Sequence, residues 1–253
     1  MDKKHLIKEK FDLTVDVGEI IIANGGEIFR AHETMLRMAK YFQLGNFDTY
    51  ILANGIFTSI AIDGEYYSCQ IRYTSMGQVD LSRVEAVNTL SRNLERDAFS
   101  VQEIRNRIEK ITAQGTSKDW LKILAAGVSC GAFGYLFRGT LWDSLAAMIA
   151  GFIMYLVSLK VLDRLHFPRM MDTIICAALS AGCCALLFHL GLGDDLNHMI
   201  IGAIFPLVPG ISFTNGVRNL MGYEHLTGII RLTDAVITAT GTAIGVGIVL
   251  TLL

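Results

Sequence analysis

The chain has 253 residues, with 22 Lys and Arg against 24 Asp and Glu and a net charge of −2. This balance provides no basic surface field, which argues against a nucleic-acid-binding protein. The charges are uneven: residues 1–119 hold 15 of the basic and 17 of the acidic residues, and the remaining 134 residues hold 7 of each. We therefore expect a cytoplasmic α+β domain over residues 1–117 and a transmembrane helical domain over residues 118–253.

The N-terminal part is predicted to have the element order α-β-β-α-α. The expected elements are a helical stretch over residues 14–43, strands over Thr49–Ile60 and Tyr66–Tyr73 with a turn at Asp63 and Gly64, a helix over Asp80–Leu94 capped by Asp80, and a helix over about Ser100–Ile111. Asn24, Gly25 and Gly26 interrupt the first stretch, and glycine there should split the helix. The first twelve residues lack the apolar core of a secretory signal.

No motif of a nucleophile, a phosphate-binding loop or a metal site appears in this part of the sequence, so we predict no cofactor. Glu27, Arg30 and Glu33 are spaced to share one helix face, which is typical of a surface charge ladder. The five cysteines have no metal-ligand spacing and are interpreted as small packing residues.

The second part contains apolar runs long enough to cross a membrane. A spanning helix needs about 17–25 mostly apolar residues. The runs are Trp120–Phe137, Leu141–Leu159, Thr173–Leu190, the shorter Met199–Phe213, and Ile229–Leu253. The sequence thus predicts an α-helical integral membrane protein with about five transmembrane helices.

The basic residues of the short links predict the orientation. The first link carries Arg138, the second carries Lys160, Arg164 and Arg169, and the third carries none. Basic residues are enriched on the cytoplasmic side. The pattern predicts a cell (inner) membrane protein with a cytoplasmic N-terminus and a C-terminus outside.

Small residues recur at four-residue spacing on three of these runs. In lipid, such spacing lets helix backbones approach closely. The pairs are Gly127/Gly131, Ala178/Gly182 and Gly241/Gly245. We expect them to lie at helix–helix contacts.

The fourth run is predicted to be a broken helix. Pro206 and the pair Pro209-Gly210 interrupt it at membrane depth, and transporters use such breaks to bind ions and anionic solutes. Asn215 and Arg218 follow on one helix face. The alternative is a kinked helix that ends in a cytoplasmic loop, with Arg218 only setting the orientation.

The last run carries Arg231 and Asp234, three residues apart. Ionisable residues in a membrane helix mark functional sites by default, although a structural ion pair near the interface is the alternative. The predicted substrate-binding residues are Pro206, Pro209, Gly210, Ser212, Asn215, Arg218, Arg231 and Asp234. His189 and His198 bracket two aspartates, but their spacing matches no closed metal site.

Four segments together resemble the threonine/serine exporter family. They are NGGEIFRAHETMLRMAKYFQLG, the strand pair after it, DLSRVEAVNTL, and PLVPGISFTNGVRNLMGYEHLTGIIRLTDA. The family's Arg-Val-Glu-like stretch appears as residues 30–33, where Arg30 and Glu33 match and the middle differs. The resemblance implies one five-helix half of a ten-helix exporter, similar to the larger subunit of the two-chain succinate exporters (the YjjP type).

The sequence therefore predicts a subunit of a secondary exporter, and the resemblance implies threonine, serine or succinate as its solute. The resemblance implies a second small membrane subunit as partner, or else another copy of the chain, and we expect contacts with lipid and none with nucleic acid. A membrane-tethered hydrolase is one alternative, but no nucleophile–base arrangement is recognisable. A signalling or scaffold protein is another, but a plain anchor needs neither a broken helix nor intramembrane charge.

Overall fold

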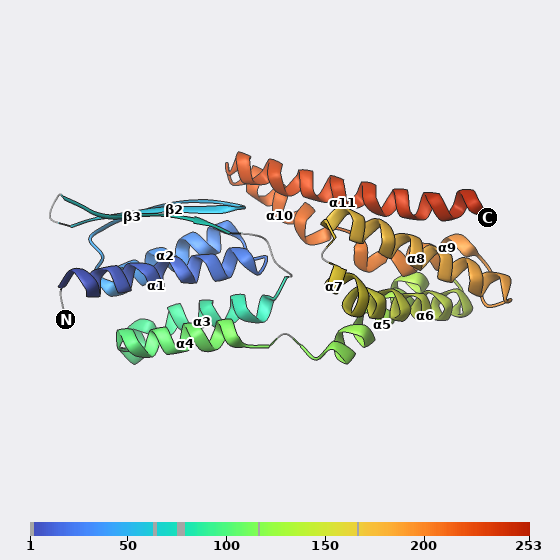
Figure 1. Cartoon of the computed structure of the whole chain (residues 1–253), viewed down its shortest axis with the longest axis horizontal. Coiled ribbons are helices and arrows are strands. Elements are labelled where there is room, and N and C mark those ends of the chain that lie inside the picture. The colour runs from blue at the N-terminus through green and yellow to red at the C-terminus, as the bar shows by residue number, and fades with distance from the viewer. Residues whose placement is uncertain (1–2, 63–64, 75–78, 116, 166) are drawn as a thin grey trace. The chain divides into compact units, whose positions relative to one another are not determined.

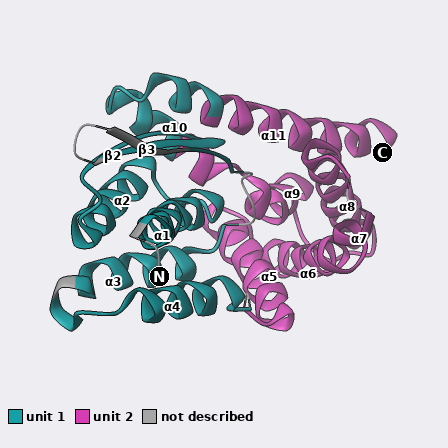
Figure 2. Ribbon diagram, turned by 60° about the vertical axis from the view of Figure 1, so that its left-hand side comes forward, with its two compact units in different colours: residues 1–116, 215–230 teal, residues 117–214, 231–253 magenta. Residues whose placement is uncertain are grey.

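The computed structural model describes residues 3–62, 65–74, 79–115, 117–165 and 167–253 (Figure 1). The described residues are mostly helical, with one three-stranded sheet. Two compact units are present, residues 1–116 with 215–230 and residues 117–214 with 231–253 (Figure 2). These units are defined by contacts within the chain and not by independent folding, so the domain boundary at residue 117 stays a prediction.

The N-terminal residues form helices around an antiparallel sheet. The elements are α1 (Lys3–Ala23), α2 (Ile28–Phe42), β1 (Asn46–Leu52), β2 (Gly55–Ile62), β3 (Glu65–Tyr73), α3 (Leu81–Asp97) and α4 (Val101–Ala113). The strands follow one another in the order β1-β2-β3. The prediction of a single strand over Thr49–Ile60 was wrong, because the chain turns at Ala53 and Asn54 and Leu52 pairs with Gly55. The predicted turn at Asp63 and Gly64 lies outside the described residues.

The predicted interruption of the first helix is confirmed. α1 ends at Ala23 and α2 begins at Ile28. Gly25 has a φ of +82°, a left-handed conformation that glycine adopts without steric cost. The Asn24 side chain donates to the Ile20 carbonyl at 2.7 Å and so satisfies part of the end of α1.

A single apolar core joins the helices to one face of the sheet. Ile51, Ile56 and Ile60 point into this core and are at most 3% exposed. Tyr50 and Phe57 pair across β1 and β2 on the opposite face and remain exposed. This alternation is the period of two expected for a sheet with one covered face.

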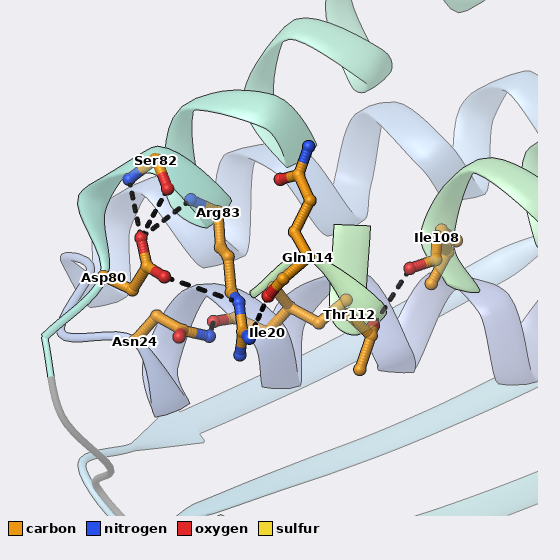
Figure 3. A network of polar contacts seen from close by, with 8 residues as sticks. All are labelled: Ile20, Asn24, Asp80, Ser82, Arg83, Ile108, Thr112 and Gln114. Atoms are coloured by element: carbon orange, nitrogen blue, oxygen red, sulfur yellow. Dashed lines mark hydrogen bonds and ion pairs between the residues drawn. The ribbon is translucent and has the colours of Figure 1, made fainter. Parts of the chain in front are cut away.

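Asp80 anchors the start of α3, as predicted (Figure 3). Its carboxylate accepts hydrogen bonds from the backbone N–H groups of Ser82 and Arg83. Arg83 in turn lies 3.5 Å from the Asp80 carboxylate and donates to the Gln114 carbonyl at 2.6 Å. Because the Asp80 N–H also donates to the Asn24 carbonyl, the network ties the end of α1 to the start of α3 and the end of α4.

The remaining elements are helical. They are α5 (Asp119–Leu136), α6 (Leu141–Val157), the π-helical turn η1 (Ser158–Leu162), α7 (Asp163–Leu165), α8 (Arg169–His189), α9 (Leu196–Ile204), the 3-10 turn η2 (Phe205–Leu207), α10 (Gly210–Met221) and α11 (His225–Leu252). Among the described residues, three helices are long and apolar enough to span a membrane: Leu141–Leu165, Arg169–His189 and His225–Leu252. The bent pair of α9–η2 and α10 raises the number to four at most. The α5 helix is not among them, so the count of five stays a prediction.

Two of the three small-residue pairs lie at helix contacts, as expected. A Cβ added to Gly131 would meet Met148 of α6 at 3.0 Å, and one added to Gly127 would collide with the Phe152 ring. Gly245 lies against the backbone of Ile174 in α8. The expectation for Gly182 was wrong, because an added Cβ there would meet nothing within 4 Å.

Candidate functional site

The predicted break in the fourth run is present. α9 ends at Ile204, the turn η2 follows, and α10 begins at Gly210, with a bend of 59° between the two halves. Pro206 offers no N–H to a preceding carbonyl, and Pro209 blocks continuation of the helix. The Gly210 N–H instead donates to the Val208 carbonyl at 2.8 Å. Irregular backbone within a membrane is stable only if protein or a wet cavity surrounds it.

Helix α5 covers one side of this break. The Cys130 thiol donates to the Ala203 carbonyl at 3.4 Å, and the Phe133 ring stacks on Phe205. Gly202 lies against the backbone of Gly134, so α9 and α5 approach at van der Waals distance. Cys130 therefore links α5 to α9 through a hydrogen bond, a role that its position in an apolar run did not indicate.

The polar residues after the break lie on α10. Gly210, Ser212, Asn215 and Arg218 are all part of this one helix. Ser212 and Asn215 are half-buried, and Arg218 is exposed. The i+3 spacing of Asn215 and Arg218 places them on one helical face, as predicted.

Arg218 is paired with a carboxylate from the N-terminal residues of its own compact unit. Its guanidinium contacts Glu27, which immediately precedes α2. The other carboxylate oxygen of Glu27 lies 3.3 Å from Arg30. The side chains of Arg218 and Glu27 are 63% and 23% exposed. An exposed pair of this kind contributes about 0–1 kcal/mol, so Arg218 can exchange its partner at little cost.

Arg231 is different, because its side chain is buried. Its side chain is 2% exposed, and Nε has no hydrogen-bond partner among the described residues. Its charged neighbours are Asp234 and Arg169, and no ion pair joins Arg231 to Asp234 within the described chain. Asp234 still attracts the Arg231 charge, so the structural and the functional interpretations of these two residues both stay predictions. A buried guanidinium is costly unless an anion compensates its charge.

Sequence reasoning missed Asp143. This residue is fully buried at the start of α6, where its carboxylate accepts from the Thr140, Asp194 and Asp195 N–H groups at 2.7–3.0 Å. The motif Thr140-x-x-Asp143 is a capping box that the sequence could have revealed. Asp194 and Asp195, in the link between α8 and α9, are 51 and 52 residues from Asp143 in the sequence. No pattern of neighbouring residues predicts contacts over such a separation.

The two histidines at the end of α8 and in the first turn of α9 do not form a metal site within the described residues. His189 Nδ1 lies 2.9 Å from the Ala185 carbonyl, and His198 lies 3.4 Å from the Asp195 carboxylate. No group of three or more His, Cys, Asp or Glu side chains in the described chain could hold a metal ion.

Comparison with known proteins identifies a family over nearly the whole chain. A family model described as "Putative threonine/serine exporter" matches residues 12–253. The "Probable threonine/serine exporter" of Mycobacterium tuberculosis (strain ATCC 25618 / H37Rv) is 23% identical over 242 residues, which is 94% of this chain. The chain spans only 45% of the length of that relative. No solved structure matches.

Proposed function

Because the chain belongs to the threonine/serine exporter family, we propose that it is one subunit of a secondary transporter that exports small carboxylate-bearing solutes. The solutes we consider are threonine, serine and the dicarboxylate succinate. The family is one of transporters, which points away from an enzyme. The sequence contains no nucleotide-binding motif, so an ion gradient or the gradient of the solute would supply the energy.

The observation that carries this proposal is the buried guanidinium of Arg231, whose Nε has no hydrogen-bond partner among the described residues. A membrane helix holds such a group at considerable cost, and the cost falls when an anion binds it. The planar guanidinium fits a carboxylate through two parallel hydrogen bonds. Arg231 is thus our first candidate for the residue that receives the solute.

The break in the fourth run supports the same function. Pro206, Pro209 and Gly210 interrupt the helical hydrogen-bonding pattern of the backbone. The polar face of α10 follows this interruption. We propose that Ser212, Asn215 and Arg218 contact the solute during passage, and that Asp234 adjusts the charge near Arg231. Transporters place solute sites at discontinuous helices of this kind.

A second membrane subunit is part of the proposal. The relative from Mycobacterium tuberculosis is more than twice as long as this chain, which supports a second half supplied by another chain or by a second copy. The charge pattern of the links supports a cytoplasmic N-terminus and an external C-terminus in the cell membrane.

The test is export of labelled threonine, serine and succinate from loaded cells with and without the chain and its partner subunit. Arg231→Lys keeps a charge but loses the two-point contact, and it should reduce export about ten- to a hundredfold, which corresponds to ~1.5–3 kcal/mol. Arg138→Gln, in the exposed link between α5 and α6, is the matched control and should export normally. Full export by Arg231→Lys at equal membrane insertion would contradict the proposal.

A further inference from the structure

The compact unit that contains the N-terminal residues holds a pocket of about 370 Å³. Its walls come from Glu27 and the start of α2, from β1, from the end of α10 and from the segment between α10 and α11. The lining residues are Glu27, Ile28, Phe29, His32, Thr49, Tyr50, Ile51, Arg218, Asn219, Gly222 and Glu224. All of them belong to the same unit. Small-molecule pockets in proteins begin at roughly 300 Å³, so the volume admits a small metabolite.

The pocket presents charges of both signs. Among the lining residues, Arg218 contributes a positively charged guanidinium group, and Glu27 and Glu224 contribute two carboxylates. Glu27 contacts Arg218 directly. Asn219, Thr49 and Tyr50 add neutral hydrogen-bonding groups next to the apolar side chains of Ile28 and Ile51.

We propose that this pocket binds an α-amino acid as a zwitterion, with the ligand carboxylate on Arg218 and the ligand ammonium on Glu27. The inference deepens the proposed function and rests on it, since it assigns to Arg218 a ligand of the transported class. It adds Glu27 as the ammonium-binding residue, and the residues that line the site do not include Arg231.

The charges favour a zwitterion over a dicarboxylate. A zwitterion inserted between Arg218 and Glu27 gives each of the two a partner of opposite sign, so neither charge is left uncompensated. A dicarboxylate would place a second negative charge beside Glu27 and Glu224, which repel it. Since the Arg218 side chain is 63% exposed, its exchange of one carboxylate partner for another costs little.

Binding to the purified full-length chain in lipid nanodiscs tests the proposal. The probes are L-threonine, 3-hydroxybutyrate, which lacks the ammonium group, 1-amino-2-propanol, which lacks the carboxylate, and succinate. We expect threonine to bind at least about tenfold more tightly than each of the other three, because each lost charge-assisted contact changes the affinity by about that factor.

Two variants locate the contacts. Glu27→Gln should weaken threonine binding about tenfold or more and leave 3-hydroxybutyrate binding unchanged or stronger. Arg218→Gln should weaken threonine binding and leave 1-amino-2-propanol binding unchanged. Glu33→Gln is the matched control on α2, because Glu33 pairs with Arg37 outside this pocket, and it should bind threonine normally.

The binding experiment is repeated with Arg231→Gln to separate this site from the export function. We expect that variant to lose export together with any threonine binding at Arg231, and to keep the threonine binding at the pocket, which Glu27→Gln still weakens. Equal binding of succinate and threonine, or unchanged threonine binding by Glu27→Gln, would overturn the zwitterion site. Normal export by Arg231→Gln would overturn the proposed function and leave the pocket result standing.

Discussion

Substitution of Gly202 by alanine tests how closely α9 approaches α5. A Cβ at residue 202 would lie 2.7 Å from Gly134 Cα and 2.9 Å from the Cys130 carbonyl oxygen. These are backbone atoms, which cannot rotate away as the end of a side chain can. To reach the 3.4 Å of an ordinary contact, the two helices must separate locally by about 0.7 Å, the difference between the two distances.

We expect Gly202→Ala to destabilise the protein by about 1–2 kcal/mol. Overpacking of this kind costs about 1–3 kcal/mol, and the separation also lengthens the contact between the Cys130 thiol and the Ala203 carbonyl. Alanine has a higher helix propensity than glycine, and this offsets up to about 1 kcal/mol of the destabilisation.

The measurement is the thermal unfolding midpoint in detergent, followed by the loss of monodisperse protein after heating. Gly182→Ala is the matched control, because it makes the same chemical change in helix α8 where nothing lies within 4 Å of the added Cβ. It should leave the midpoint unchanged or raise it, whereas Gly202→Ala should lower it by several degrees. Equal midpoints for the two variants would refute the close approach of α9 and α5.

Three further outcomes are expected. Asp143→Asn should lower the unfolding midpoint, because an amide N–H₂ group replaces one of the two carboxylate oxygens that accept backbone N–H groups, whereas Asp194→Asn should not. Arg218→Lys should reduce export with normal membrane insertion, and a fully active variant would return Arg218 to the role of setting orientation. The hydrogen bonds from Ser82 and Arg83 hold the pKa of Asp80 below its ordinary value of 3.8, so the carboxylate stabilises the fold above that pH and loses this effect as the pH falls through the lowered pKa. Asp80→Asn should therefore be less stable than the wild type in denaturant unfolding at pH 7, with a difference that shrinks below about pH 4; a difference independent of pH would contradict this origin.

Features set by neighbouring residues could be predicted from the sequence. Gly25 ends a helix because glycine tolerates the left-handed backbone, and Asp80 caps α3 because its side chain reaches the N–H groups of the first turn. The bend in the fourth run follows from the missing N–H groups of Pro206 and Pro209. The one local error was the strand over Thr49–Ile60, where the turn residues before Gly55 stand within an otherwise apolar run.

Contacts between distant parts of the chain could not be predicted. From the sequence, Glu27 is interpreted as one member of a charge ladder with Arg30 and Glu33. Of the contacts in that ladder, the one between Glu27 and Arg30 is present. Its second partner, Arg218, is 191 residues away. Cys130 and Ala203 are separated by 73 residues. No periodicity records such pairings, because they depend on which helix faces pack together.

Burial of the apolar helices bears on the proposed partner. The rest of the chain buries 39% of the apolar window of α8 but only 22% of that of α11. Gly241 and Gly245 of α11 face α8, whereas large side chains elsewhere on the helix stay exposed: Val236, Ile237, Ile244, Ile248 and Leu252. Lipid alone can cover such a surface, because lipid tails are as apolar as these side chains. The second membrane subunit proposed above would need an apolar surface to pack against, and this face of α11 offers one. We therefore expect the partner subunit to pack on the exposed face of α11.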